Sequence, residues 1–200
     1  MASEATLVIK IDNKKPVEIT DFTDSFQAIG NEYYKFLLES LDFKLSKTTK
    51  LYVREINTGS ITTILTDLVV PVLPFIEYSN SIIEYSKFLK AGFDFFLGMT
   101  EKPKEFDYTD CNNFNNIIKP IAKDNGSQVI FTGEVNNTTN INNPIINFSF
   151  SSVEANAIQN GIANQKKSLK EHSLLIHEKV LFIGILLNIL KSQNQSTRGI

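Results

Sequence analysis

The longest periodic apolar segment of the chain covers residues 67–98 and constrains the fold more than any other stretch. Its large apolar side chains recur at every third or fourth position: Phe75, Tyr78, Ile82, Tyr85, Leu89 and Phe96. This spacing predicts a helix of about seven to eight turns with one broad apolar face. Gly92 takes the one position on that face where a large residue is expected, and Gly98 is a natural end for the helix. Such a face has to be covered by other elements.

Two strand pairs are predicted as antiparallel hairpins. The first joins 51–56 to 60–65 through Asn57-Thr58-Gly59, where the glycine can adopt the positive φ of a tight turn. The second joins 128–135 to 145–150 through a polar, asparagine-rich loop. Both pairs are rich in β-branched residues and alternate in polarity, as strands with one buried face do.

The remaining elements are one more strand and three more helices. Alternation over 6–11 predicts an N-terminal strand, and helical spacing of apolar residues predicts helices over 22–45, 111–122 and 153–173. Ser151 or Ser152 together with Glu154 has the spacing of a capping box at the start of the last helix. Asp107 and Asp110 also fall where a helix begins, so we interpret this carboxylate pair as capping residues and not as catalytic groups.

Residues 178–190, EKVLFIGILLNIL, are apolar but too short for a membrane span. We interpret them as a buried strand, because Val180, Ile183 and Ile185 are β-branched and Gly184 interrupts the run. The expected fold is α+β, with antiparallel hairpins packed against a long central amphipathic helix and two or three further helices. We expect residues 1–200 to form a single α+β domain. Because the sequence stops soon after a predicted strand, the alternative is that these residues are the N-terminal part of a longer protein.

Composition limits the classes of function. The 200 residues carry a net charge of −2, which argues against a broad nucleic-acid-binding surface. Cys111 is the single cysteine, so the chain has neither an internal disulfide nor a cysteine-based metal site. The start, MASEATLVIKID, lacks the apolar run of a secretory signal, and we expect a cytoplasmic location without a transmembrane segment. The high asparagine, isoleucine and lysine content suggests a bacterial or phage genome.

No motif in the sequence identifies a reaction. Phosphate-binding glycine loops, zinc-hydrolase helices and nucleophile elbows are missing from the sequence. His172 and His177 are five residues apart and would point in different directions on a helix or a strand, so we predict no metal site. Cys111 is expected to be a buried structural thiol. We therefore predict no catalytic residue and no cofactor, and favour a protein that is not an enzyme. An enzyme is the third interpretation, and it would require a pocket that contains His172, His177 or Cys111 with a carboxylate.

The aromatic side chains of the segment 67–98 are the predicted partner-binding residues, with Tyr78, Tyr85, Phe88 and Phe95 as anchors. The expected function is a non-catalytic protein-interaction or oligomerisation domain, with another protein or a second copy as the partner. The alternative is a ligand- or nucleic-acid-binding sensor domain. In that interpretation Lys50, Tyr52 and Arg54 would contact an anion or a nucleic acid.

Overall fold

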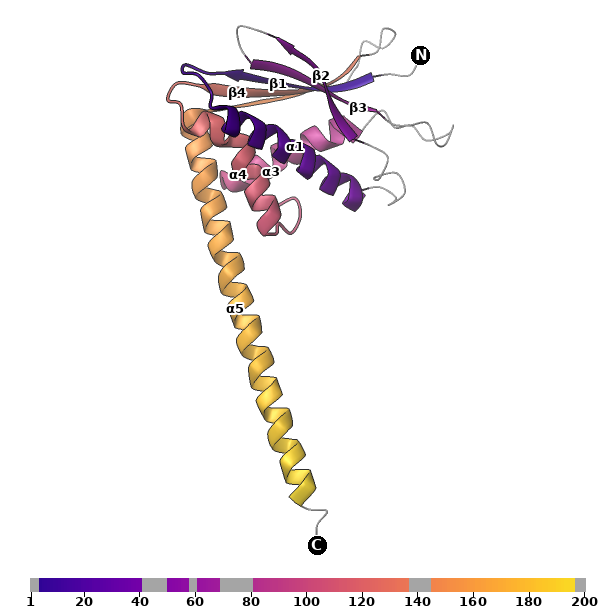
Figure 1. Cartoon of the computed structure of the whole chain (residues 1–200), viewed down its shortest axis with the longest axis vertical. Helices are drawn as coiled ribbons and strands as arrows, with labels where there is room; N and C mark the ends of the chain where they lie inside the picture. Colours follow the sequence, from indigo (N-terminus) through magenta and orange to yellow (C-terminus); the bar gives the residue numbers. More distant parts are fainter. Residues whose placement is uncertain (1–3, 41–49, 58–60, 69–80, 137–144, 197–200) are drawn as a thin grey trace, which may run out of the picture. The chain divides into compact units, whose positions relative to one another are not determined.

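The computed structural model describes residues 4–40, 50–57, 61–68, 81–136 and 145–196. Within these ranges the chain forms four helices and a five-stranded antiparallel sheet, which confirms the predicted α+β fold (Figure 1). The order is β1 (Glu4–Asp12), α1 (Ile19–Ser40), β2 (Lys50–Asn57), β3 (Ile61–Leu68), α3 (Ser81–Phe96), α4 (Tyr108–Ala122), β4 (Gln128–Asn136), β5 (Ile146–Ser151) and α5 (Ser152–Ser196). Two compact units, Met1–Ile162 and Ala163–Ile200, divide within α5, and each is described by itself.

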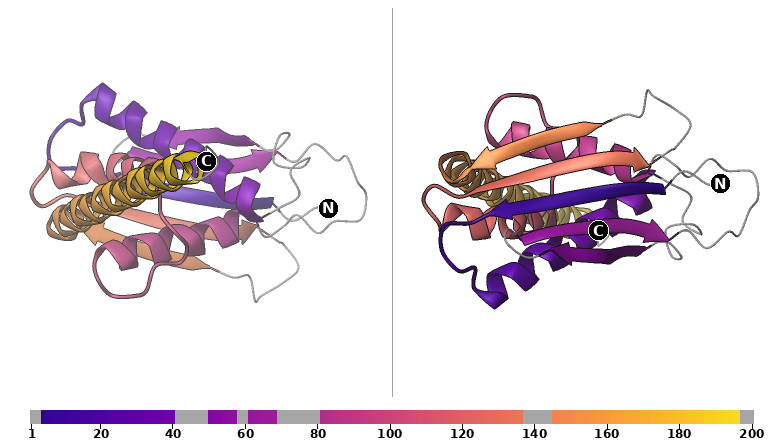
Figure 2. Two further views of the ribbon diagram at one scale, coloured as in Figure 1. Left: turned by 90° about the horizontal axis from the view of Figure 1, so that it is seen from below. Right: turned by 90° about the horizontal axis from the view of Figure 1, so that it is seen from above.

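The sheet has the strand order β2-β3-β1-β4-β5, and all neighbouring strands are antiparallel (Figure 2). Both predicted hairpins are confirmed as the pairs β2–β3 and β4–β5. The N-terminal strand lies between them, with Leu7 opposite Leu65 on β3 and Gly133 on β4. This central place suits a strand in which every residue from Ala5 to Ile9 is β-branched or apolar. A register shift between Val53 and Glu55 marks a β-bulge in the edge strand β2.

The helices α1, α3 and α4 cover one face of the sheet, as the views from above and below show (Figure 2). Leu7, Ile9 and Ile11 of β1 point to this face and are buried. On the neighbouring strand β4, Phe131 is also buried on this face. Burial of one such side chain contributes about 1.5–3 kcal/mol, so this layer supplies much of the stability of the first unit.

The helix α3 supplies the aromatic centre of the core. Tyr85 and Phe93 are completely buried, and the Phe93 ring packs edge-on against Phe114 of α4 with centroids 4.9 Å apart. A methyl group on Gly92 would collide with the same Phe114 ring, which explains the missing large residue on the apolar face. The described helix runs from Ser81 to Phe96, whereas the prediction began at Asp67. Asp67 and Leu68 are instead the end of strand β3, and residues 69–80 lie outside the described residues.

The pairs Asp107–Asp110 and Ser151–Glu154 cap their helices, as predicted. Asp107 is the N-cap of α4 and forms a reciprocal capping box with Asp110. At the start of α5, the Ser151 N–H donates to Glu154 at 2.8 Å, and the Glu154 N–H donates to the Ser151 hydroxyl at 3.3 Å. The beginning of α5 is held in the core through Ala155, Ile158 and Ile162, which are all buried.

The strand predicted over 178–190 is wrong, because these residues are helical and belong to α5. A continuous apolar run fits a buried strand or a helix equally well when its length alone is considered. The backbone continues the helix that begins at Ser152 through this run, and Gly184 does not interrupt it. The chain therefore has five strands in its described part and no unpaired strand near its end.

Candidate functional site

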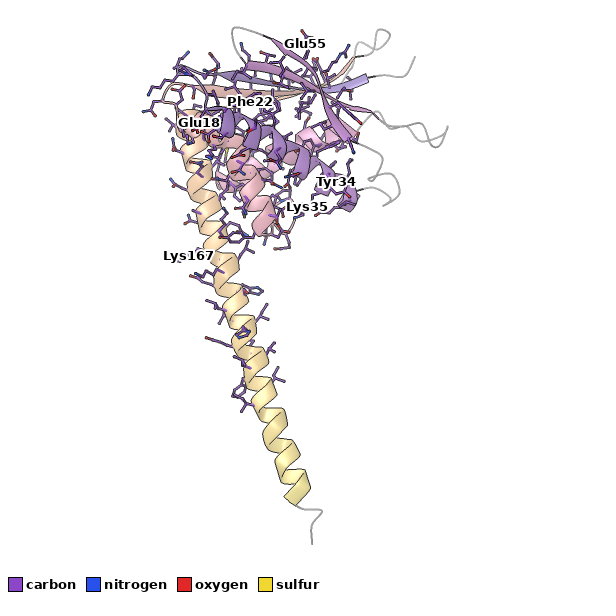
Figure 3. All side chains as sticks on the ribbon, in the orientation of Figure 1. Glu18, Phe22, Tyr34, Lys35, Glu55 and Lys167 are labelled. Atoms are coloured by element: carbon purple, nitrogen blue, oxygen red, sulfur yellow. The ribbon has the colours of Figure 1, made fainter. Side chains whose placement is uncertain are left out.

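The first unit contains a buried group of charged side chains between α1 and α4. Glu32 of α1 and Asp110 of α4 are both fully buried. The Asn113 amide donates to Glu32 Oε2 at 2.8 Å, while Lys35 Nζ donates to Asp110 Oδ1 at 2.6 Å. Lys104 Nζ lies 3.3 Å from Asp110 Oδ1 and 3.8 Å from Glu32 Oε1. We call these residues the α1–α4 charge cluster (Figure 3 labels Lys35).

Electrostatics in this cluster favour a neutral Glu32 and a charged Lys35. Burial raises the pKa of Glu32 to about 7, and the negative charge of Asp110 adds to this effect, while Asn113 and Lys104 oppose it. Burial alone would lower the pKa of Lys35, but its hydrogen bonds to Asp107 and Asp110 outweigh burial and raise it. Protonation of Glu32 therefore removes one of two close negative charges.

The contacts of this cluster indicate a role in the stability of the first unit. A carboxyl group with a raised pKa is a common feature of catalytic acids, but buried ion-pair networks produce the same shift. Here the Asn113 amide donates to one Glu32 oxygen, and the other Glu32 oxygen faces Lys104. Lys104 Nζ also lies over the Phe88 ring, 5.1 Å from its centroid. The cluster joins α1, α4 and the segment before α4, and we assign it to stability.

The predicted anchors on α3 lie mainly in the core. Tyr85 is completely buried and its hydroxyl donates to the Ile29 carbonyl at 2.8 Å. Phe88 and Phe95 are half-buried and pack against the Phe106 ring, with centroids 6.3 Å and 5.6 Å away. Tyr78 lies outside the described residues. A partner-binding role for these residues stays a prediction, and their packing favours a core role.

The residues of the alternative site lie on the edge strand β2. Lys50, Tyr52 and Arg54 are exposed, and Arg54 falls at the β-bulge. Exposed Glu55 follows Arg54 in the sequence and adds a negative charge to the strand (Figure 3). This mixture of charges gives little support to phosphate binding, and contact with a nucleic acid through these residues stays a prediction.

The residues considered for metal binding or nucleophilic catalysis differ in burial. Cys111 is fully buried in α4, whereas His172 and His177 are exposed on α5. Because α5 is a helix, five residues turn the second imidazole by about 140° from the first. Among the described residues, no three histidine, cysteine or acidic side chains gather as metal ligands.

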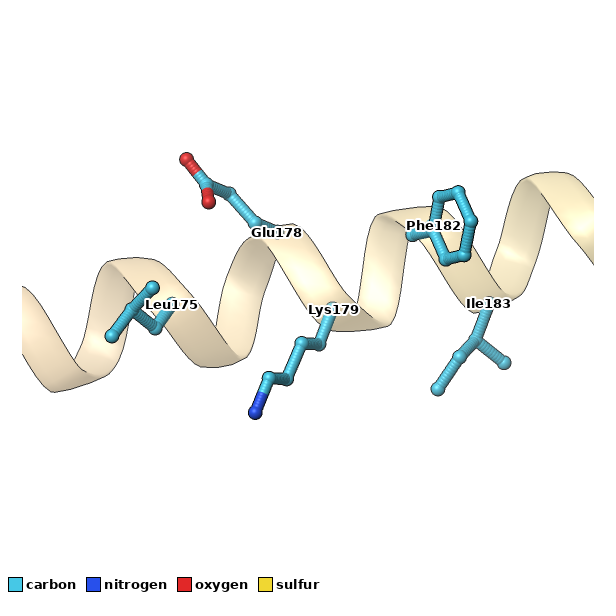
Figure 4. Close-up of a pocket in the computed structure, with 5 residues that line it drawn as sticks. All are labelled: Leu175, Glu178, Lys179, Phe182 and Ile183. Carbon is cyan, nitrogen blue, oxygen red and sulfur yellow. The ribbon is translucent and has the colours of Figure 1, made fainter.

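The most unusual surface lies in the second unit, on the part of α5 after Ile162. Large apolar side chains between Leu174 and Ile185 are each at least half exposed: Leu174, Leu175, Ile176, Val180, Leu181, Phe182, Ile183 and Ile185. A shallow hollow runs along one side of this segment, between Leu175, Phe182 and Ile183, with Glu178 and Lys179 at its edges (Figure 4). Folded monomers rarely expose so many large apolar groups together. We call residues 169–185 the α5 apolar segment.

A seven-residue repeat runs through the α5 apolar segment. Leu169, Ile176 and Ile183 are seven residues apart, and the sequence continues this spacing at Leu190. Val180 falls between two of these positions and lies on the same side of the helix. This is the spacing of a coiled-coil seam. The signal is present in the sequence, but the interpretation of 178–190 as a strand conceals it.

None of the helices in the described part of the chain has an apolar stretch sufficient to cross a membrane. Comparison with known proteins adds no assignment, since no protein family, curated protein or solved structure matches this chain.

Proposed function

We propose that this chain is a non-catalytic protein-interaction module that self-associates through the α5 apolar segment. The observation that carries the proposal is the run of large apolar side chains from Leu174 to Ile185, each at least half exposed. Exposed apolar area of this extent costs free energy in water, and its burial against a partner releases that free energy. The first unit would then be a folded body attached to an association helix.

A second copy of the same segment is the partner that the sequence pattern supports. A seam repeated every seven residues is complementary to another helix with the same repeat. A lipid surface is less well supported, because surface-binding helices carry a strongly basic polar face. The polar residues here include Glu171 and Glu178 as well as Lys170 and Lys179.

The test is the solution mass of the full chain, measured by light scattering over a series of concentrations. We expect the native chain to have at least twice the monomer mass. The double variant Ile176→Glu with Ile183→Glu should be monomeric, because it places two charges in the seam. Both side chains are at least half exposed in the single chain, so the first unit should keep its circular dichroism spectrum and thermal transition.

The matched control is Asn164→Glu with Ser168→Glu, which adds the same charge to exposed polar positions of α5 outside the seam. This variant should associate like the native chain. A native chain that is monomeric at every concentration would contradict the proposal. Binding to anionic or zwitterionic lipid vesicles without any self-association would assign the segment to a membrane surface instead.

A further inference from the structure

Given the proposed self-association, the residues that flank the seam determine how copies of α5 can be arranged. With Leu169, Ile176 and Ile183 at heptad position d, the a positions hold Lys166, Ser173 and Val180. The flanking e positions hold Lys170, His177 and Gly184, and the g positions hold Gln165, His172 and Lys179. Glu171 and Glu178 fall at f, on the side away from the seam.

These flanking residues favour parallel helices. In a parallel arrangement each g residue faces the e residue of the next heptad, which pairs Gln165 with Lys170, His172 with His177, and Lys179 with Gly184. In an antiparallel pair e faces e and g faces g. The antiparallel register that matches Ile176 with Val180 would place Lys179 against Lys179 of the second copy. Two lysines at close range repel each other, and no acidic residue at e or g offsets the repulsion.

The identity of the seam residues favours more than two helices. Isoleucine at d, as in Ile176 and Ile183, shifts parallel coiled coils from two strands towards three or four. Leu175 and Phe182 fall at heptad position c, about 130° from the seam, so they do not bear on the number of helices.

From this arrangement we infer that the α5 apolar segment forms a parallel, in-register bundle of three or more copies of this chain. The bundle needs no other partner to cover the seam. In such a bundle Ser173 lies beside Ser173 of the neighbouring copy. Ser173 and Ile183 of different copies are about 15 Å apart along the helix axis.

Site-directed disulfide formation in the full chain tests this arrangement. Ser173→Cys alone should form a disulfide between copies under mild oxidation, because the two Cα atoms come within the range that a disulfide requires. A mixture of Ser173→Cys and Ile183→Cys chains, one of them carrying a mass tag, should give no mixed disulfide. Lys167→Cys, at exposed heptad position b outside the seam, is the matched control and should cross-link at least tenfold more slowly (Figure 3 labels Lys167). The native chain controls for Cys111, which is fully buried.

Each result separates this inference from the proposed function. Mixed disulfides between positions 173 and 183, with an increased solution mass, would show antiparallel association and overturn the inference while the proposed function stands. A solution mass equal to two chains would overturn the inferred number of three or more copies. A monomeric mass with no cross-link at position 173 would overturn both. A mass of three or more with the homotypic cross-link alone supports the inference.

Discussion

Asn113 on α4 donates a hydrogen bond of 2.8 Å to Glu32 on α1, and both side chains are buried between the two helices. The bond satisfies one carboxyl oxygen, while the other has no hydrogen-bond partner among the described groups. Asp110, one helical turn before Asn113, supplies a negative charge that opposes ionisation of Glu32. The contact between α1 and α4 is therefore sensitive to protonation of a single carboxyl group.

We expect Glu32→Gln to make the protein more stable at pH 8 but not at pH 5. The pKa of Glu32 is about 7 in the folded chain against an ordinary value of 4.5. Between these two values the folded state holds a proton that the unfolded state has lost, so the free energy of unfolding falls as pH rises. The full difference corresponds to about 3 kcal/mol. Urea unfolding at pH 5, 6, 7 and 8 should show a smaller loss with pH for the variant.

Glu39→Gln is the matched control for this experiment. Glu39 lies on the same helix and pairs with the same Lys104 at 2.9 Å, but it is exposed. Its removal should leave the pH dependence of the native chain in place. If Glu32→Gln and native chains lost stability in parallel between pH 5 and pH 8, Glu32 would not be the titrating group.

Asp110→Ala should cost about 3 kcal/mol of stability, several times the cost of Asp107→Ala. Asp110 is fully buried, pairs with Lys35 and Lys104, and its carboxylate accepts the Asp107 N–H in the capping box. Among the described residues, its loss leaves Lys35 without a buried partner and Lys104 with Glu32 as its single buried partner. Asp107 is an exposed N-cap, and loss of such a cap typically costs about 1 kcal/mol. Chemical denaturation of both variants checks the order, and equal costs would show that capping dominates.

Local patterns predicted the hairpins and the caps because each depends on residues that are close in sequence. Asn57-Thr58-Gly59 lies between alternating runs, and Ser151 with Glu154 has the spacing of a capping box. The α1–α4 charge cluster has no local signal. Glu32 and Asn113 are 81 residues apart, so only the packed fold reveals their contact.

The prediction for residues 178–190 failed for a different reason. An apolar run rich in β-branched residues suits both a buried strand and a helix that associates with other helices. The repeat at Leu169, Ile176 and Ile183 distinguishes the two, but it begins outside the run. The central place of β1 in the sheet also lies beyond local patterns, because pairing between distant strands sets the strand order.

Tyr85→Ala should lower the free energy of unfolding by about 3–5 kcal/mol. If Tyr85 were instead an interface residue, the variant would keep the stability of the native fold. The ring is fully buried against Tyr33 and its hydroxyl donates to the Ile29 carbonyl. Tyr85→Phe, the conservative control, removes only the hydroxyl and should cost about 1–2 kcal/mol. Thermal unfolding and solution mass should be measured together. A stable Tyr85→Ala chain with reduced mass would restore the interface on α3.

Gly161→Ala should destabilise the protein, although alanine is a better helix former than glycine. A methyl group at position 161 would overlap the carbonyl group of Phe96, so either α3 or the first turns of α5 must move. Overpacking of this kind typically costs about 1–3 kcal/mol. Gly30→Ala on α1 is the matched control, because nothing lies within 4 Å of the added methyl group. That change should stabilise the chain by about 0.5–1 kcal/mol. Urea denaturation of both variants decides the matter: opposite signs are expected, and stabilisation by both would mean that α5 does not pack against Phe96 at its start.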